Sequence, residues 1–183
     1  MNNDKFNEIY TERLLLRKFK DDDFESYYDI LKQEEVSMWL GNGKRKSQED
    51  VKRVMKYFER HWTLNDYGVW AVINRETNEL IGQCGFNILE DTKETELLYA
   101  FDSKFWGKGY ATEASMAAIK FLSENFKLNP IVALAYPNND RSSNVIKKIG
   151  FEYKGMAKHF GVELLYFQLN LDKLRESNEH SVG

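Results

Sequence analysis

The stretch Glu96–Ala118, with the sequence ELLYAFDSKFWGKGYATEASMAA, decides the fold of this chain. Its first part alternates, so Glu96, Leu98 and Ala100 are expected on one face of a strand and their neighbours on the other. After two glycines, small and apolar residues recur at helical spacing from Ala111 onward. The hydrophobic period therefore changes from 2 to 3.6, which predicts a strand, a short loop and a helix.

The loop of this unit has the features of an anion-binding site. The first N–H groups of a helix lack intrahelical partners and lie at the positive end of the helix dipole, where a phosphate is stabilised. Gly107 and Gly109 leave space beside the backbone, and Lys108 adds a cation. The alternative is that the glycines serve only to turn the chain. The residues fit neither G-x-x-x-x-G-K-S/T nor G-x-G-x-x-G, the two nucleotide-binding patterns.

The segment FWGKGYATEA, residues 105–114, resembles the pattern Gln/Arg-x-x-Gly-x-Gly/Ala of the GNAT acetyltransferase superfamily. Trp106 stands in the first position, where an aromatic residue is typical of the branch that includes the RimJ and RimL ribosomal-protein N-acetyltransferases. The resemblance implies acetyl-CoA as cosubstrate, with its pyrophosphate on the loop amides. The residues implied to bind it here are Phe101, Trp106, Gly107, Lys108, Gly109, Tyr110, Ala111 and Thr112.

A second segment, residues 139–151, is similar to another pattern of the same superfamily, N-x-x-S-x-x-x-x-x-K-x-G-F. Taken by themselves, Asn139 and Ser142 are ordinary helix-capping residues. The resemblance implies that Asn139 holds the pantetheine arm of the cosubstrate and that Ser142 lies near the thioester sulfur.

The implied reaction is direct attack of a neutral amine on a thioester carbonyl. Glu96 is the predicted general base, because it lies on the strand leading to the loop and the resemblance implies a glutamate base at this place. Partial burial would raise the pKa of its carboxyl group toward neutrality; the alternative is a solvated residue at a strand edge. A backbone N–H near Phe101 is expected to stabilise the oxyanion. Many members of the superfamily carry a tyrosine general acid where this chain has Ile146, which leaves Ser142 or a bound water as the proton donor.

Three further side chains are candidates for contact with the acceptor. Trp39 lies in an apolar loop of the region that lines the acceptor slot in the resembled superfamily. Glu163 and Tyr166 occupy positions that the RimJ/RimL-like branch often fills with Asp and Tyr. A purely structural role in packing is the alternative for all three.

The whole chain gives the order β-α-α-β-β-β-α-β-α-β-β, which is that of the GNAT fold. We therefore expect one α/β domain over residues 1–175, with a mixed, mostly antiparallel twisted sheet of about seven strands and helices on both faces. The polar residues 176–183 are expected to form a disordered tail. The strands are predicted at 14–19, 67–74, 80–89, 94–102, 131–136, 151–158 and 162–171.

Composition narrows the functional classes. A net charge of −3 does not favour a surface that binds nucleic acid. No apolar run is long enough to span a membrane and no apolar leader opens the chain, so a cytoplasmic location is expected. The single cysteine, Cys84, is expected to be an inert core thiol, and His159 an exposed residue of a turn. No Cys/His cluster is present, so no metal is expected.

These observations lead to a principal hypothesis and one alternative. The first is an acetyl-CoA-dependent N-acetyltransferase acting on a primary amine, such as a protein N-terminus, a ribosomal protein or a small amine. The alternative is a regulatory module that binds acyl-CoA without turnover. Homodimers are common in the resembled branch, although nothing in this sequence indicates one.

Overall fold

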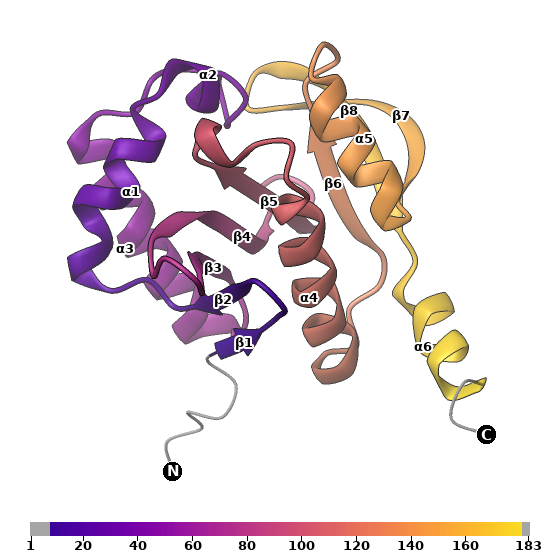
Figure 1. The fold of residues 1–183 in the computed structure, drawn as a ribbon. Coiled ribbons are helices and arrows are strands. Elements are labelled where there is room, and N and C mark those ends of the chain that lie inside the picture. Colours follow the sequence, from indigo (N-terminus) through magenta and orange to yellow (C-terminus); the bar gives the residue numbers. More distant parts are fainter. Residues whose placement is uncertain (1–7, 181–183) are drawn as a thin grey trace.

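The strands of the protein form one sheet, seen in a computed structural model that describes residues 8–180 (Figure 1). The strand order is β1-β2-β3-β4-β5-β6-β8-β7. All neighbouring strands are antiparallel except β5 and β6, which are parallel. The strands are β1 (Glu8–Tyr10), β2 (Leu14–Arg17), β3 (Val69–Asn74), β4 (Leu80–Ile88), β5 (Thr95–Phe101), β6 (Ile131–Ala135), β7 (Glu152–His159) and β8 (Val162–Leu169).

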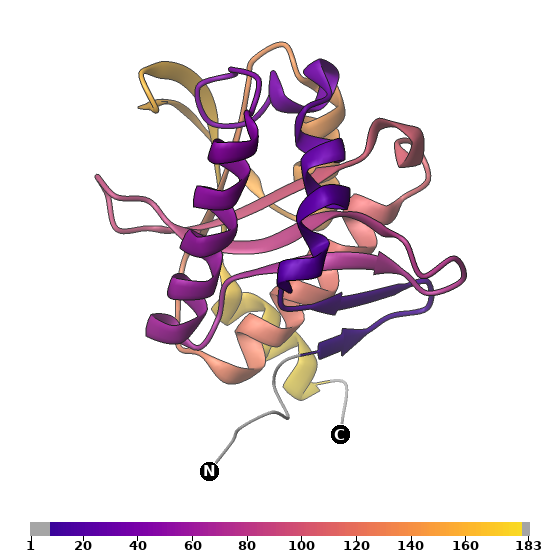
Figure 2. The same ribbon diagram turned by 90° about the vertical axis from the view of Figure 1, so that its left-hand side faces the viewer.

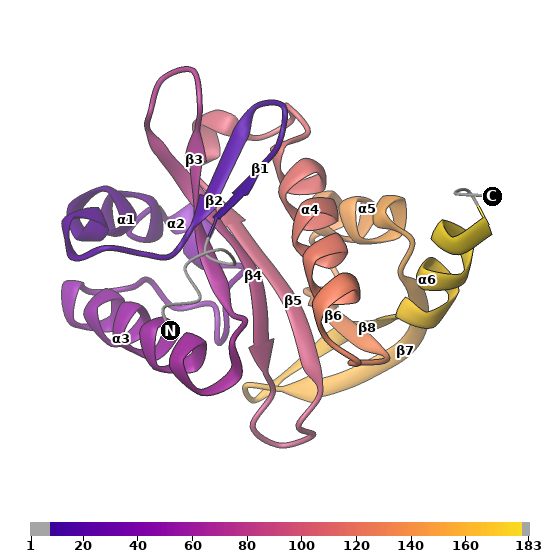
Figure 3. The same ribbon diagram turned by 90° about the horizontal axis from the view of Figure 1, so that it is seen from below.

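Helices cover both faces of the sheet. Figure 2 shows α1 and α3 lying side by side over one face, and Figure 3 shows α4, α5 and α6 on the other. Ser47 caps the start of α3, because its hydroxyl accepts the N–H of Asp50. The helices are α1 (Phe24–Leu31), α2 (Glu34–Ser37), α3 (Gln48–Asn65), α4 (Tyr110–Asn125), α5 (Asp140–Ile149) and α6 (Leu171–His180).

Strand β5 contributes to the apolar cores on both faces of the sheet. Leu98 and Ala100 pack with the residues of α1 and α3, whereas Leu97 and Phe101 join the cluster that contains the buried face of α4. This confirms the predicted alternation, since successive side chains of a strand point to opposite faces. The predicted mixed sheet with helices on both faces is also confirmed.

The ends of the chain differ from the prediction. An eighth strand, β1, pairs with β2 and has only three residues, too few to give a periodic signal. The disordered tail predicted from residue 176 is wrong for residues 176–180, which belong to α6. Leu171 at the start of that helix is fully buried, so the chain is anchored beyond the last strand. Residues 181–183 lie outside the described part of the chain.

The parallel pair β5 and β6 separates toward its carboxyl end. Only Glu96 with Val132 and Leu97 with Ala133 are in register, although β5 continues to Phe101. Beyond Leu97, the edge of β5 that faces β6 therefore has no strand partner among the described residues. An opening therefore forms in the middle of the sheet between β5 and β6, because both strands continue beyond the pair of Leu97 and Ala133. Within residues 8–180, no helix has both the length and the apolar character needed to cross a membrane.

Candidate active site

A cavity of about 650 Å³ occupies the opening between β5 and β6. It reaches both faces of the sheet, because β5 presents side chains to each. Most residues that the sequence analysis selected as candidates line it: Trp39, Glu96, Phe101, Trp106, Gly107, Gly109, Tyr110, Ala111, Thr112, Asn139 and Ser142. The two sequence motifs, separate along the chain, thus border one cavity.

Three of the selected residues do not line this cavity. The Tyr166 hydroxyl donates to the Glu94 carboxylate beside the start of β5 and accepts a hydrogen bond from Gln168 Nε2 at 2.8 Å. Glu163 is exposed on β8. Glu163 and Tyr166 thus lie outside the cavity wall, because their positions along β8 direct these side chains elsewhere, and their contact with an acceptor stays a prediction. Lys108 is exposed, with its ammonium 5.4 Å from the centre of the Phe105 ring.

The glycine loop leaves the first amides of α4 without partners. Gly107 and Gly109 have φ values of +74° and +80°, a left-handed conformation that disfavours residues with a Cβ. The first helical hydrogen bond runs from the N–H of Glu113 to the carbonyl of Gly109, at 3.0 Å. No described residue accepts a hydrogen bond from the N–H groups of residues 110–112, which border the cavity. This arrangement is suited to bind an anion.

Trp106 braces the loop against the end of β5. Its indole Nε1 donates to the carbonyl oxygen of Phe101 at 2.9 Å. The guanidinium of Arg141, from the first turn of α5, lies 4.0 Å from the centre of the indole ring, a cation–π contact. Arg141 also lines the cavity and so adds a cation that the sequence analysis did not select. The sequence feature that could have identified Arg141 is its position within the second motif, residues 139–151.

Glu96 is a buried carboxyl group at the cavity wall. It is only 8% exposed, which overturns the alternative of a solvated residue at a strand edge. Asn87 lies directly across from it on β4 and accepts a hydrogen bond from the Tyr57 hydroxyl. No described residue donates a hydrogen bond to the Glu96 carboxylate, and burial raises the pKa of this group to about 8. A carboxyl group with that pKa can accept a proton near neutral pH.

Ser142 is joined to a tyrosine that sequence reasoning missed. The Tyr99 hydroxyl, on β5, lies 2.9 Å from Ser142 Oγ. Burial raises the pKa of Tyr99 to about 12, although the hydrogen bond with Ser142 acts in the opposite direction. Asn139 caps α5, because its Oδ1 accepts the N–H of Ser142 at 3.2 Å. Its capping role is thus present together with its place on the cavity wall.

A bridge crosses from β6 to the segment that follows α2. The Tyr136 hydroxyl donates to the carbonyl oxygen of Gly41 at 2.8 Å, and its ring contacts that of Trp39 edge-on with centres 6.0 Å apart. All three residues line the cavity. The bridge holds the loop that carries Trp39 over the cavity, beside the end of β6.

Two residues outside the site clarify the sequence expectations. Cys84 is fully buried and burial raises the pKa of its thiol to about 12, so it is inert as predicted. The expectation of an exposed His159 is wrong: the residue is 5% exposed and its Nδ1 lies 3.1 Å from the Asp91 carboxylate. The turn between β4 and β5 folds against it. Among the described residues, no three His, Cys, Asp or Glu side chains are placed to hold a metal ion.

Comparison with known proteins agrees with this geometry. The family described as "Acetyltransferase (GNAT) domain" matches residues 13–152. The uncharacterized N-acetyltransferase YoaA of Bacillus subtilis is 26% identical over 153 residues, which cover 83% of this chain and 86% of YoaA. The crystal structure of an acetyltransferase from Agrobacterium tumefaciens is 28% identical, with a TM-score of 0.80, and the match covers 89% of this chain and 94% of that one.

A structure of the RimL ribosomal α-N-protein acetyltransferase in complex with coenzyme A shares the fold, with a TM-score of 0.77. It is 18% identical, and the match covers 91% of this chain and 99% of that one. The chain belongs to the GNAT acetyltransferase family, and it is an N-acetyltransferase enzyme. Members of this family transfer an acetyl group from acetyl-CoA.

Proposed function

We propose that this protein transfers the acetyl group of acetyl-CoA to a primary amine by direct attack on the thioester. One observation carries the proposal: a single cavity joins the unpartnered amides of the glycine loop to Glu96 and to Ser142. An anion-binding end and a proton-accepting group are thus held in one space. An enzyme that acylates an amine with a phosphate-bearing thioester needs both.

The cavity residues fit acetyl-CoA. The N–H groups at the start of α4 suit the pyrophosphate, and Gly107 has nothing within 4 Å of where a Cβ would stand, so a ligand can approach the backbone there. Beyond Leu97 the edge of β5 has no strand partner among the described residues, which leaves backbone groups for the amides of the pantetheine arm. Asn139, at the start of α5, faces the same space.

The chemistry follows from the two sides of β5. Glu96 lies on the face toward α1 and α3, where it takes one proton from the amine nitrogen as that nitrogen bonds to the acetyl carbon, and it later releases this proton to solvent. Ser142 lies on the opposite side, where its hydroxyl supplies one proton to the departing sulfur and regains one from solvent. A backbone N–H of β5 near Phe101 stabilises the developing oxyanion. The products are an acetylated amine and a free thiol, so protons balance.

The acceptor is an amine on a protein N-terminus or a small molecule, as in the RimJ/RimL-like branch. The fold shared with an α-N-protein acetyltransferase and the FWGKGYATEA segment support this choice. An α-amino group has a pKa near 8 and a lysine near 10.4, so a base with a pKa near 8 is matched to the former. The wall of the cavity is mainly apolar, and it includes Tyr27, Leu31 and Leu98.

Calorimetric titration tests the proposed cosubstrate. Acetyl-CoA is expected to bind with a micromolar dissociation constant, whereas ATP and NAD bind far more weakly. Gly109→Val is expected to abolish binding, because position 109 has a φ of +80°, a conformation that a residue with a branched Cβ disfavours, so the loop would change shape. Equal binding of ATP, or no binding of acetyl-CoA, would exclude the proposed function.

A second assay tests turnover. Purified protein with acetyl-CoA and a panel of peptide N-termini and small amines is expected to release free thiol in proportion to acetylated product. Glu96→Gln and Ser142→Ala are expected to retain acetyl-CoA binding and lose most of this turnover. Unchanged turnover of a true acceptor in both variants would refute the assignment of these residues.

A further inference from the structure

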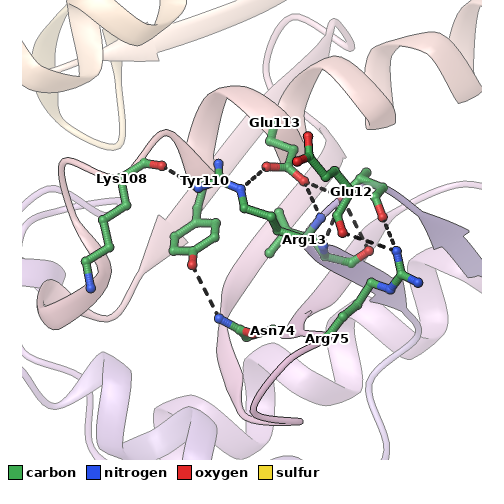
Figure 4. Close-up of polar contacts among 9 residues, drawn as sticks. Glu12, Arg13, Asn74, Arg75, Lys108, Tyr110 and Glu113 are labelled. Atoms are coloured by element: carbon green, nitrogen blue, oxygen red, sulfur yellow. Dashed lines mark hydrogen bonds and ion pairs between the residues drawn. The ribbon is translucent and has the colours of Figure 1, made fainter.

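We propose that Arg13 is the positioning residue of the phosphate-binding loop: it fixes the loop and neutralises the carboxylate that α4 carries beside its own anion site. The inference rests on the proposed function, because it assigns how the acetyl-CoA phosphates are received. Arg13 lies in the turn between β1 and β2 and does not line the cavity. Its contacts place it directly behind the loop (Figure 4).

Four contacts join Arg13 to the loop and to the first turns of α4. Its Nη1 donates to the carbonyl oxygen of Lys108 at 2.8 Å, between the two glycines. Its Nε and its backbone N–H donate to the two carboxylate oxygens of Glu113, at 2.7 and 2.9 Å. The guanidinium also lies 4.3 Å from the centre of the Tyr110 ring, which lines the cavity. One side chain thus holds the loop, the first helical residue and the first acidic residue of α4.

Glu113 explains why a cation is needed there. Its carboxylate lies near the start of a helix whose N–H groups would receive a phosphate, and two negative charges would repel each other. Partial burial acts to raise the pKa of Glu113, but hydrogen bonds from Thr11 and Arg13 and the charge of Arg13 lower it overall. The group therefore stays ionised. The charge of Arg13 neutralises the carboxylate, and the hydrogen bond from the Thr11 hydroxyl, 2.6 Å from Glu113 Oε1, helps to orient it.

One nitrogen of the Arg13 guanidinium lies beside the glycine loop. Arg13 Nη2 makes no hydrogen bond with any described residue, and a Cβ built on Gly109 would stand 3.4 Å from it. The nitrogen therefore lies against the glycine that begins α4. Arg13 both offsets the carboxylate and adds positive potential where the phosphate is expected.

Arg75 provides a matched control in the same cluster. It supports the same β1–β2 turn, with its Nη1 donating to the carbonyl oxygens of Thr11 and of Glu12, the latter at 3.3 Å. Figure 4 shows both arginines at this turn. Arg75 makes no contact with the glycine loop or with Glu113 among the described residues. Removing it weakens the turn and leaves the electrostatics of the loop in place.

The experiment compares two acetyl thioesters, acetyl-CoA and S-acetylpantetheine, which lacks the pyrophosphate and the adenosine. Dissociation constants are measured for the wild-type protein and for Arg13→Met, Arg13→Lys and Arg75→Met. Arg13→Met is expected to weaken acetyl-CoA binding about tenfold or more, the effect of losing a charged hydrogen-bonding partner. S-Acetylpantetheine binding is expected to change less than about twofold, and Arg75→Met to leave both constants unchanged.

The role of Glu113 is tested by Arg13→Met combined with Glu113→Gln. Removing the uncompensated carboxylate is expected to restore a large part of the acetyl-CoA affinity, which a loop that has merely lost its support would not show. Equal losses for both thioesters in Arg13→Met, or no loss for either, would overturn the inference. Arg13→Lys keeps the charge with fewer donors, so its affinity for acetyl-CoA is expected to lie between those of wild type and Arg13→Met. An affinity below that of Arg13→Met would also overturn the inference. If wild-type protein fails to bind acetyl-CoA, the proposed function itself is refuted.

Discussion

The hydroxyl of Tyr99 lies 2.9 Å from Ser142 Oγ, and this contact joins the centre of the sheet to the start of α5. It spans the side of the opening opposite Glu96, where the thioester sulfur is expected. Because burial keeps the Tyr99 hydroxyl protonated, that hydroxyl is a persistent partner for the serine. We propose that this pair supplies the proton that a tyrosine general acid supplies in many members of the superfamily, at the position where this chain has Ile146.

Replacing Tyr99 by Phe is expected to lower kcat about tenfold, with the KM for acetyl-CoA changed less than about twofold, because the ring remains and only the hydrogen bond to Ser142 is lost. Ser142→Ala is expected to lower kcat further. Because the two groups act as a unit, the double variant should resemble Ser142→Ala. Steady-state kinetics on all three variants check this, and additive losses would show that Tyr99 acts independently of Ser142.

The pKa of Glu96 sets an expected pH dependence of activity. The carboxyl group must be ionised to accept a proton, so kcat/KM should rise as pH increases through about 8. Glu96→Gln should lower kcat about 10²- to 10⁴-fold and remove this inflection. Rates measured from pH 6 to 9.5 with one acceptor of known pKa check the prediction. A wild-type profile with no inflection in this range beyond that of the acceptor would contradict the assignment.

The same group predicts a pH-dependent stability. Its pKa is higher in the folded state than the ordinary value of 4.5, so folding takes up a proton between about pH 4.5 and pH 8 and the free energy of unfolding falls as pH rises through that window. Each pKa unit corresponds to about 1.4 kcal/mol. Glu96→Gln should therefore match wild type near pH 4.5 and be progressively more stable toward pH 8. Urea unfolding at several pH values measures this difference, and a constant difference would contradict it.

Substitutions at two glycines with nearly equal φ distinguish an effect on acetyl-CoA binding from an effect on folding stability. Gly107 and Gly161 have φ values of +74° and +78°, and neither has an atom within 4 Å of an added Cβ. Alanine at either position should cost about 1–2 kcal/mol of stability from backbone strain. Only Gly107→Ala should also weaken acetyl-CoA binding, since Gly161 lies in the turn between β7 and β8. Paired unfolding and calorimetric measurements check this; equal affinity of the two variants would contradict a role for the loop in binding.

Much of the fold could be predicted because its signals are local. The alternation in β5, the cap at Ser47 and the left-handed Gly150 that ends α5 each depend on residues close together in the chain. The elements that were missed, β1, α2 and α6, carry weak local patterns and are held by partners elsewhere in the fold. The candidate residues around the glycine loop could also be predicted, because they form one continuous segment of the sequence.

The contacts that shape the site join residues that are far apart in the sequence. Glu163 and Tyr166 were selected by resemblance to the RimJ/RimL-like branch, and in the structure the Tyr166 hydroxyl donates to Glu94. Tyr99 gave no signal, because its partner Ser142 is 43 residues away in the sequence. The pairing of Tyr99 with Ser142 depends on how α5 packs on the sheet, which no local pattern contains.

By itself, the sequence determined the strand, loop and helix of residues 96–118, the second motif and the membership of the acetyltransferase family. Each of these depends on residues that are close together in the chain. Only the tertiary structure decided that Glu96 is buried with a raised pKa, since burial is a property of everything packed around it. It also decided that Arg13 meets Glu113, 100 residues later in the chain. Charges and donors interact through space, and the fold alone sets those distances.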